Sequence, residues 1–254
     1  MRRVLVLAIT LATVGAAAHV APSVDDNNRY LKLTPLGDRV RLAYTVFFGE
    51  VPGAQARRSI DSDRNGSISD AEGAVFGNRV AAEVAAALEI TVDQQRHPVA
   101  WHLVSVGMGT PQTTGGSFSI DMVTYLCFRS ARGRHEVRLR DRFRIPKPGE
   151  TEIRIEDSPG ITIDRARLGD IADPTHEFKL VGPSGPLADP GLEVVMTASD
   201  QAAVASDAIC SAAPATRGLP TLAVIGAAAV LGAMLAAATM VVLRRRRRAR
   251  SSRA

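Results

Sequence analysis

Apolar and polar residues alternate through most of the chain between residues 28 and 197, which is typical of β-strands with one buried face. The clearest case is Asn28–Phe48, where two strands are expected on either side of a turn at Pro35–Asp38. Further strands are expected at Ile90–Asp93, Val99–Val106, Ser117–Phe128, His135–Ile145, Thr151–Ile155, Ile161–Ala166, His176–Leu180 and Leu192–Thr197, with a polar turn at Gln94–Pro98. Short strands separated by Gly and Pro turns predict a mainly β fold, an antiparallel β-sandwich.

One segment departs from the period of two. Asp70–Leu88 is rich in alanine, and its larger apolar residues recur at helical spacing, which predicts a helix with one apolar face. That face would consist of Val75, Val80, Val84 and Leu88. Because Pro52–Gly53 is expected to end the preceding strand, only Gln55–Ile60 remains for a helix before the intervening loop.

The intervening loop, Asp61–Glu72, reads DSDRNGSISDAE and fits the EF-hand calcium pattern. Calcium takes about six to eight oxygen ligands, so a loop around it must present an oxygen at nearly every second residue. The expected ligands are the side chains of Asp61, Asp63 and Asn65, the carbonyl of Ser67, a water on Ser69 and both carboxylate oxygens of Glu72. Gly66 stands at the sharp turn, where positive φ favours glycine. The alternative is an ordinary surface turn, since Asp, Asn, Ser and Gly are common turn residues.

Residues 1–21 have the pattern of a secretory signal peptide. Arg2 and Arg3 precede an apolar run, and small residues follow, with cleavage expected after Ala18 or Ala21. An uncleaved N-terminal anchor is the alternative, although the apolar run is short for a bilayer span. The sequence therefore predicts an extracytoplasmic domain over residues 22–197.

Leu219–Leu243 contains no charged residue and is long enough to cross a bilayer as a helix. The arginine-rich residues 244–254 follow at once, and the positive-inside tendency places them in the cytoplasm. Residues 198–218 would form a flexible stalk between the domain and this single-pass anchor. A C-terminal sorting signal is the alternative to a retained anchor, but Leu219-Pro220-Thr221-Leu222 departs from the LPxTG motif.

The net charge of +5 arises from the two ends of the chain that this topology sets apart. Ten of the 31 basic residues lie in these ends, and none of the 26 acidic residues does. The part between the ends carries a net charge of −5, which argues against a nucleic-acid partner. The strand around His135–Ile145 places Arg138, Arg140, Arg142 and Arg144 on one face, which we interpret as a solvated sheet face. The sequence leaves open whether Cys127 and Cys210 form a disulfide.

The run from Asp38 to Gln95 joins a strand with a VxxxExP-like end at Val46–Pro52, the acidic loop, an Ala-rich helix and a strand at Glu89–Gln94. It resembles the extracytoplasmic N-terminal domain of bacterial nickel/cobalt transporter-like and hydrogenase/urease-accessory-like (HupE/UreJ-type) membrane proteins. The resemblance implies a secreted β-rich domain with one calcium loop, here on a single-pass anchor where a transporter has several membrane helices.

No Walker, GxSxG, HExxH or CxxC motif occurs, and the histidines are scattered, so the sequence predicts a binding protein and not an enzyme. The leading hypothesis is a membrane-anchored extracytoplasmic protein in which calcium stabilises an interaction domain, with a possible protein partner in the membrane or envelope. The alternatives are an accessory component of a metal-ion transporter or other membrane complex, and an enzyme whose site is dispersed along the chain.

Overall fold

The computed structural model describes residues 25–205, 207, 209 and 210. The predicted signal peptide, anchor helix and cytoplasmic tail lie outside these residues. Within the described part, no helix combines the length and apolar character needed to cross a membrane.

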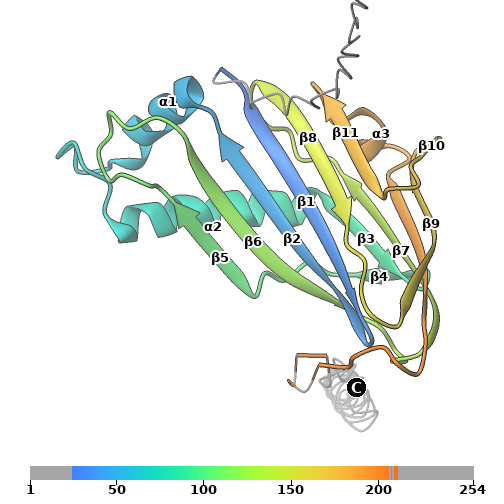
Figure 1. Cartoon of the computed structure of the whole chain (residues 1–254). Coiled ribbons are helices and arrows are strands. Elements are labelled where there is room, and N and C mark those ends of the chain that lie inside the picture. Colours follow the sequence, from blue (N-terminus) through green and yellow to red (C-terminus); the bar gives the residue numbers. More distant parts are fainter. Residues whose placement is uncertain (1–24, 206, 208, 211–254) are drawn as a thin grey trace, which may run out of the picture. The chain divides into compact units, whose positions relative to one another are not determined.

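Two six-stranded sheets lie as layers over one hydrophobic core (Figure 1). Sheet 1 has the order β11 (Glu177–Val181), β8 (Pro148–Ile155), β1 (Asn27–Leu36), β2 (Arg39–Phe48), β6 (Phe118–Cys127) and β5 (Leu103–Gly107). Sheet 2 has the order β10 (Ile171–Ala172), β9 (Ile161–Leu168), β12 (Leu192–Ala198), β7 (Gly133–Asp141), β3 (Leu88–Val92) and β4 (Gln95–His97). The mainly β fold expected from the sequence is confirmed.

The sheets are not purely antiparallel, because β1 and β8 pair in parallel with Arg29 opposite Thr151 and Leu33 opposite Ile155. Alternation within each strand cannot report the direction of its neighbour, which is why the sequence missed this pair. The polar turn expected at Gln94–Pro98 is also wrong in part. Asp93 and Gln94 make the tight turn with positive φ, and Gln95–His97 returns as strand β4.

Three helices accompany the sheets: α1 (Glu50–Ile60), α2 (Asp70–Ala87) and the short α3 (Gly185–Ala188). Helix α1 is longer than the predicted Gln55–Ile60, because Pro52 lies in its first turn, where a proline costs no intrahelical hydrogen bond. Strand β10 and helix α3 were not predicted. The predicted apolar face of α2 is right for Val80 and Val84 but wrong for Val75, which is 74% exposed.

Helix α2 packs against the inner side of strand β5, and this contact depends on glycine. A methyl group added at Gly77 would lie 2.4 Å from Cγ2 of Val106. The indole N–H of Trp101 donates to the carbonyl of Ala81 at 2.8 Å and ties the next turn of the helix to the chain before β5. The helix thereby fills the open edge between the two sheets (Figure 1).

A buried ion pair links the sheets through the core. Arg29 of β1 is 2% exposed, and its Nη1 lies 2.8 Å from Oδ2 of Asp141 at the end of β7. The Tyr44 hydroxyl donates to the same oxygen at 2.7 Å. Burial raises the pKa of the Asp141 carboxyl, and the Arg29 charge opposes that rise. Such a pair fixes the relative position of the sheets, since a half-satisfied buried charge is costly.

The segment after β12 remains attached to the domain, so the start of the predicted stalk at residue 198 is wrong. The amide of Gly37 donates to the carbonyl of Ala203 at 2.8 Å, and Asp207 pairs with the buried Arg39 at 2.6 Å. Cys210 forms a disulfide with Cys127, the last residue of β6. The pairing that the sequence left open therefore exists and attaches this segment to the end of β6, beside the start of β2.

We expect replacement of Cys127 and Cys210 by serine to lower the free energy of unfolding by about 2–5 kcal/mol, because the bond closes a long loop. The two cysteines are 83 residues apart. Chemical denaturation with and without a thiol reductant measures the difference. The reductant should destabilise the wild type and leave the double variant unchanged; equal midpoints for all four conditions would contradict the prediction.

Candidate metal centre

The loop predicted to bind calcium connects α1 to α2, and both of its ends are fixed by helix-terminal hydrogen bonds. At the first end, the amide of Asp61 donates to the carbonyl of Arg57 at 3.1 Å and closes the last turn of α1. At the second end, Ser69 is the N-cap of α2 and forms a capping box with Glu72. These hydrogen bonds therefore fix both ends of the loop independently of any bound ion.

Three of the predicted ligands lie together. One carboxylate oxygen from each of Asp61, Asp63 and Glu72 lies within 4.8 Å of the other two. Asp61 is only 9% exposed and comes from the buried end of α1, whereas Asp63 is exposed. Three negative charges at this separation repel one another, and oxygen-rich anionic groups are the ligands that calcium prefers. The arrangement suits a hard divalent cation chemically.

The other predicted ligands organise the loop through hydrogen bonds. The Asn65 amide nitrogen Nδ2 donates to Asp63 at 2.8 Å, and the Asn65 side-chain oxygen accepts from the backbone N–H of Ser67 at 2.8 Å. Gly66 adopts φ +86° and donates its N–H to Asp61 at 2.9 Å, as expected for the sharp turn. The Ser69 hydroxyl donates to Glu72 at 2.9 Å, so its contact in the structure is with the helix cap.

Both oxygens of Glu72 are already hydrogen-bonded. Oε1 accepts from the backbone N–H and the hydroxyl of Ser62 at 2.6 and 2.7 Å, and Oε2 accepts from the same two groups of Ser69 at 3.0 and 2.9 Å. These donors, led by the Ser69 backbone N–H, lower the pKa of Glu72 to about 2. The carboxylate is thus ionised at neutral pH. A cation bound by both oxygens would replace the two hydroxyl donors, which rotate freely.

The loop is paired on its other side with the connection between β5 and β6. Ser67 and Gln112 form an isolated antiparallel β-bridge. The amide of Ile68 donates to the carbonyl of Pro111 at 2.7 Å, and the amide of Thr113 donates to the carbonyl of Gly66 at 3.1 Å. The sequence contains no second EF-hand loop, and residues 111–113 supply the backbone pairing in its place. Figure 1 shows this connection beside the loop.

Arg57 of α1 holds that connection in position. Its guanidinium is 0% exposed and donates to five backbone carbonyls of residues 108–117. The acceptors are the carbonyls of Met108, Thr110, Gln112, Gly116 and Ser117. Burial lowers the pKa of Arg57, since desolvation disfavours the charged form. The group also lies 5.5 Å from the centre of the Phe118 ring.

The role of Arg57 was not predicted from the sequence. Arg57 and Arg58 are adjacent and identical in type, and no local pattern distinguishes the buried one from the exposed one. The Gly/Thr-rich composition of residues 107–116 indicates a loop whose backbone carbonyls are available. It does not indicate that these carbonyls converge on one side chain from a helix about 50 residues earlier.

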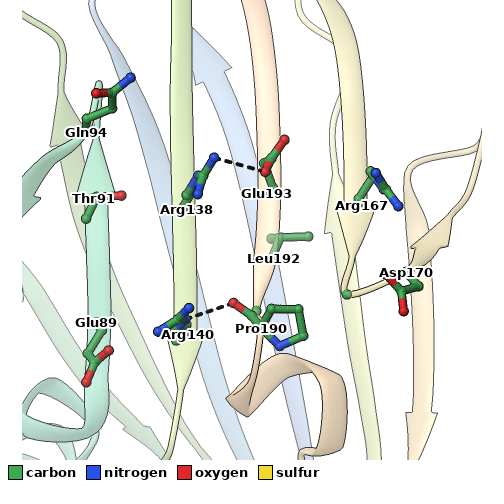
Figure 2. A pocket seen from close by; sticks show the side chains of 12 residues that line it. Glu89, Thr91, Gln94, Arg138, Arg140, Arg167, Asp170, Pro190, Leu192 and Glu193 are labelled. Carbon is green, nitrogen blue, oxygen red and sulfur yellow. Dashed lines mark hydrogen bonds and ion pairs between the residues drawn. The ribbon is translucent and has the colours of Figure 1, made fainter.

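A second candidate is the arginine-bearing outer face of sheet 2, shown in Figure 2. Arg138 contacts Glu193 at 3.3 Å, and Arg140 donates to the carbonyl of Pro190 at 2.9 Å. A shallow cavity of about 630 Å³ on this face is lined by three arginines and three acidic residues, namely Arg138, Arg140, Arg167, Glu89, Asp170 and Glu193. Its charges balance, which supports the interpretation of this face as a solvated, charge-paired surface.

A third candidate is the pair His135 and Asp93, in which Nδ1 of the histidine lies 2.9 Å from Oδ2 of the aspartate. The imidazole is 4% exposed and stacks on Phe128 with ring centres 4.0 Å apart. Its Nε2 is buried and has no hydrogen-bond partner among the described residues. A substrate in solvent has no access to that nitrogen. The pair therefore contributes to packing at the end of the sheet.

No protein-family model matches the chain, and no curated protein matches it either.

We expect Arg57→Met to lower the free energy of unfolding by more than about 3 kcal/mol, because it leaves several buried carbonyls without a donor. Arg58→Met is the matched control, since Arg58 is the exposed neighbour on the same helix. It should change stability by no more than about 0.5 kcal/mol. Urea denaturation of the full chain measures both, and similar effects of the two substitutions would contradict the role of Arg57.

The low pKa of Glu72 predicts a pH-dependent contribution to stability. The pKa is lowered from 4.5 to about 2 in the folded chain, so ionised Glu72 stabilises the fold above pH 4.5 and loses this effect as the pH falls toward 2. Thermal melting of the wild type and Glu72→Gln in chelator should therefore differ by a constant amount at neutral pH. The two melting temperatures should converge below pH 4.5; a gap that persists at pH 2 would contradict this assignment.

Proposed function

We propose that this protein binds calcium through the Asp61–Glu72 loop and that the ion stabilises an interaction domain. The observation that carries the proposal is the convergence of the Asp61, Asp63 and Glu72 carboxylates within 4.8 Å in a loop fixed at both ends. Asn65, the Ser67 carbonyl and a water on Ser69 complete the proposed ligand set. Bound calcium would offset the mutual repulsion of the carboxylates.

The ion is proposed to be structural and not a signal. Calcium sensors of the EF-hand class open a groove between two helices when the ion binds. Here α1 is held by Arg57 to residues 108–117, α2 packs on β5, and the loop is bridged to Gln112. Opening such an assembly would break buried contacts on both sides. The arrangement favours a structural ion that stabilises the connection between α1 and α2.

The proposed location is extracytoplasmic, on a single-pass membrane anchor at 219–243. The Cys127–Cys210 disulfide supports this location, because disulfides persist mainly in oxidising compartments. The domain would present itself to a protein partner in the membrane or envelope, without an enzymatic activity of its own. The alternative, suggested by the sequence resemblance, is an accessory component of a metal-ion transporter; co-purification with a multi-pass transporter would favour it.

Calcium is expected to raise the melting temperature of the full chain. With a dissociation constant of the order of 10⁻⁴ M, typical of extracellular modules, about 10 mM calcium stabilises the fold by about 2.7 kcal/mol. For a domain of this size that corresponds to a rise of about 5–10 °C. Differential scanning calorimetry in calcium and in chelator measures the shift.

Three variants test whether the loop is responsible. Asp61→Ala and Glu72→Ala should abolish the calcium-dependent shift, whereas Asp70→Asn should retain it, because Asp70 is an exposed neighbour outside the ligand pattern. Magnesium should give a smaller shift than calcium, since it demands stricter octahedral geometry. A wild-type midpoint that does not move in calcium would overturn the proposal.

A further inference from the structure

A cavity of about 390 Å³ lies at one end of the domain, away from the ligand residues of the loop. Because β1 and β8 run in parallel, both strands begin at this end, and Arg29 of β1 faces Thr151 of β8 across their pairing. The other walls come from residues 144–149 and from the turn 182–184 that follows β11. The cavity therefore depends on the one parallel pair in sheet 1.

Arg29 lines this cavity and is almost fully buried, with 2% exposure. Its Nη1 pairs with Asp141 and donates to the Ser184 hydroxyl at 2.8 Å, and its Nη2 donates to the carbonyl of Phe143 at 2.7 Å. Its Nε–H has no hydrogen-bond partner among the described residues. This N–H has almost no accessible surface, so Arg29 forms a fixed wall of the cavity and does not donate to a group bound there.

The rest of the lining is positive and apolar. Arg144 is exposed and forms no ion pair with a described residue. None of the ten lining residues is acidic, and the charge of Asp141 beneath them is balanced by Arg29. The apolar part of the lining is provided by Ile145, Pro148 and Pro183, and Asn27, Thr151 and Ser184 are its neutral polar residues. An exposed arginine without an ion pair to a described residue thus lies beside a small apolar wall.

We propose that this cavity binds a small organic carboxylate with a short aliphatic chain. The carboxylate would accept hydrogen bonds from Arg144, since a guanidinium group matches the planar carboxylate. The aliphatic chain would pack against Ile145, Pro148 and Pro183. A volume of about 390 Å³ lies at the lower end of the range for ligand pockets and suits a chain of a few carbons.

Isothermal titration of the full chain with sodium hexanoate tests this site, with 1-hexanol as the uncharged probe of similar length. Hexanoate should bind saturably, and hexanol at least tenfold more weakly. Arg144→Gln should weaken hexanoate binding about tenfold, because a charge-assisted hydrogen bond is lost. Arg167→Gln is the matched control, since Arg167 is an exposed arginine on β9 with no ion pair to a described residue, and it should leave binding unchanged.

Hydrogen exchange on the wild type locates the ligand independently of any variant. The amide of Gly182 donates to the carbonyl of Gly149 at 2.7 Å within the cavity wall, so its exchange should slow in hexanoate while that of α2 does not change. Equal affinity for hexanoate and hexanol would overturn the proposal, as would equal weakening by the two arginine variants or no protection near Gly182. Calcium binding is tested separately, because neither probe involves the Asp61–Glu72 loop.

Discussion

The burial of charged guanidinium groups is the constraint on which the arrangement of this domain depends. Among the described residues, Arg29, Arg39 and Arg57 are the three largest side chains that are fully buried. A buried arginine is tolerated only where acceptors surround it, so each one fixes the segments that supply those acceptors. Arg29 joins the two sheets through Asp141, Arg39 joins the segment after β12 through Asp207, and Arg57 joins α1 to residues 108–117.

Arg57 differs from the other two because its acceptors are neutral carbonyls and not carboxylates. Five carbonyls that converge on one cation require the 108–117 segment to fold back on itself, and that fold brings residues 111–113 to the edge of the Asp61–Glu72 loop. The connection between β5 and β6 thus supplies backbone pairing to the Asp61–Glu72 loop. A single loop can therefore remain ordered within a β-rich domain.

Much of the fold was predictable because its causes are local. Strands β1 and β2 follow from strict alternation, and the N-cap of α2 follows from Ser69 and Glu72 at capping-box spacing. The errors arose where the outcome depends on distant partners. Val75 matched a helical apolar face but is largely exposed, Pro52 opened a helix where a strand end was expected, and the stalk boundary failed because Cys127 lies far from Cys210 in sequence.

The sequence by itself determined the strand periodicity, the spacing of oxygen-bearing side chains in the Asp61–Glu72 loop and the capping of the helix that follows, since each depends on residues within about one or two turns of chain. Only the tertiary structure decided the parallel pairing of β1 with β8, the choice of Arg57 over Arg58 for burial, and the Cys127–Cys210 disulfide. These features depend on contacts between segments that are distant along the chain, and side-chain periodicity contains no information about which distant segment will be the neighbour.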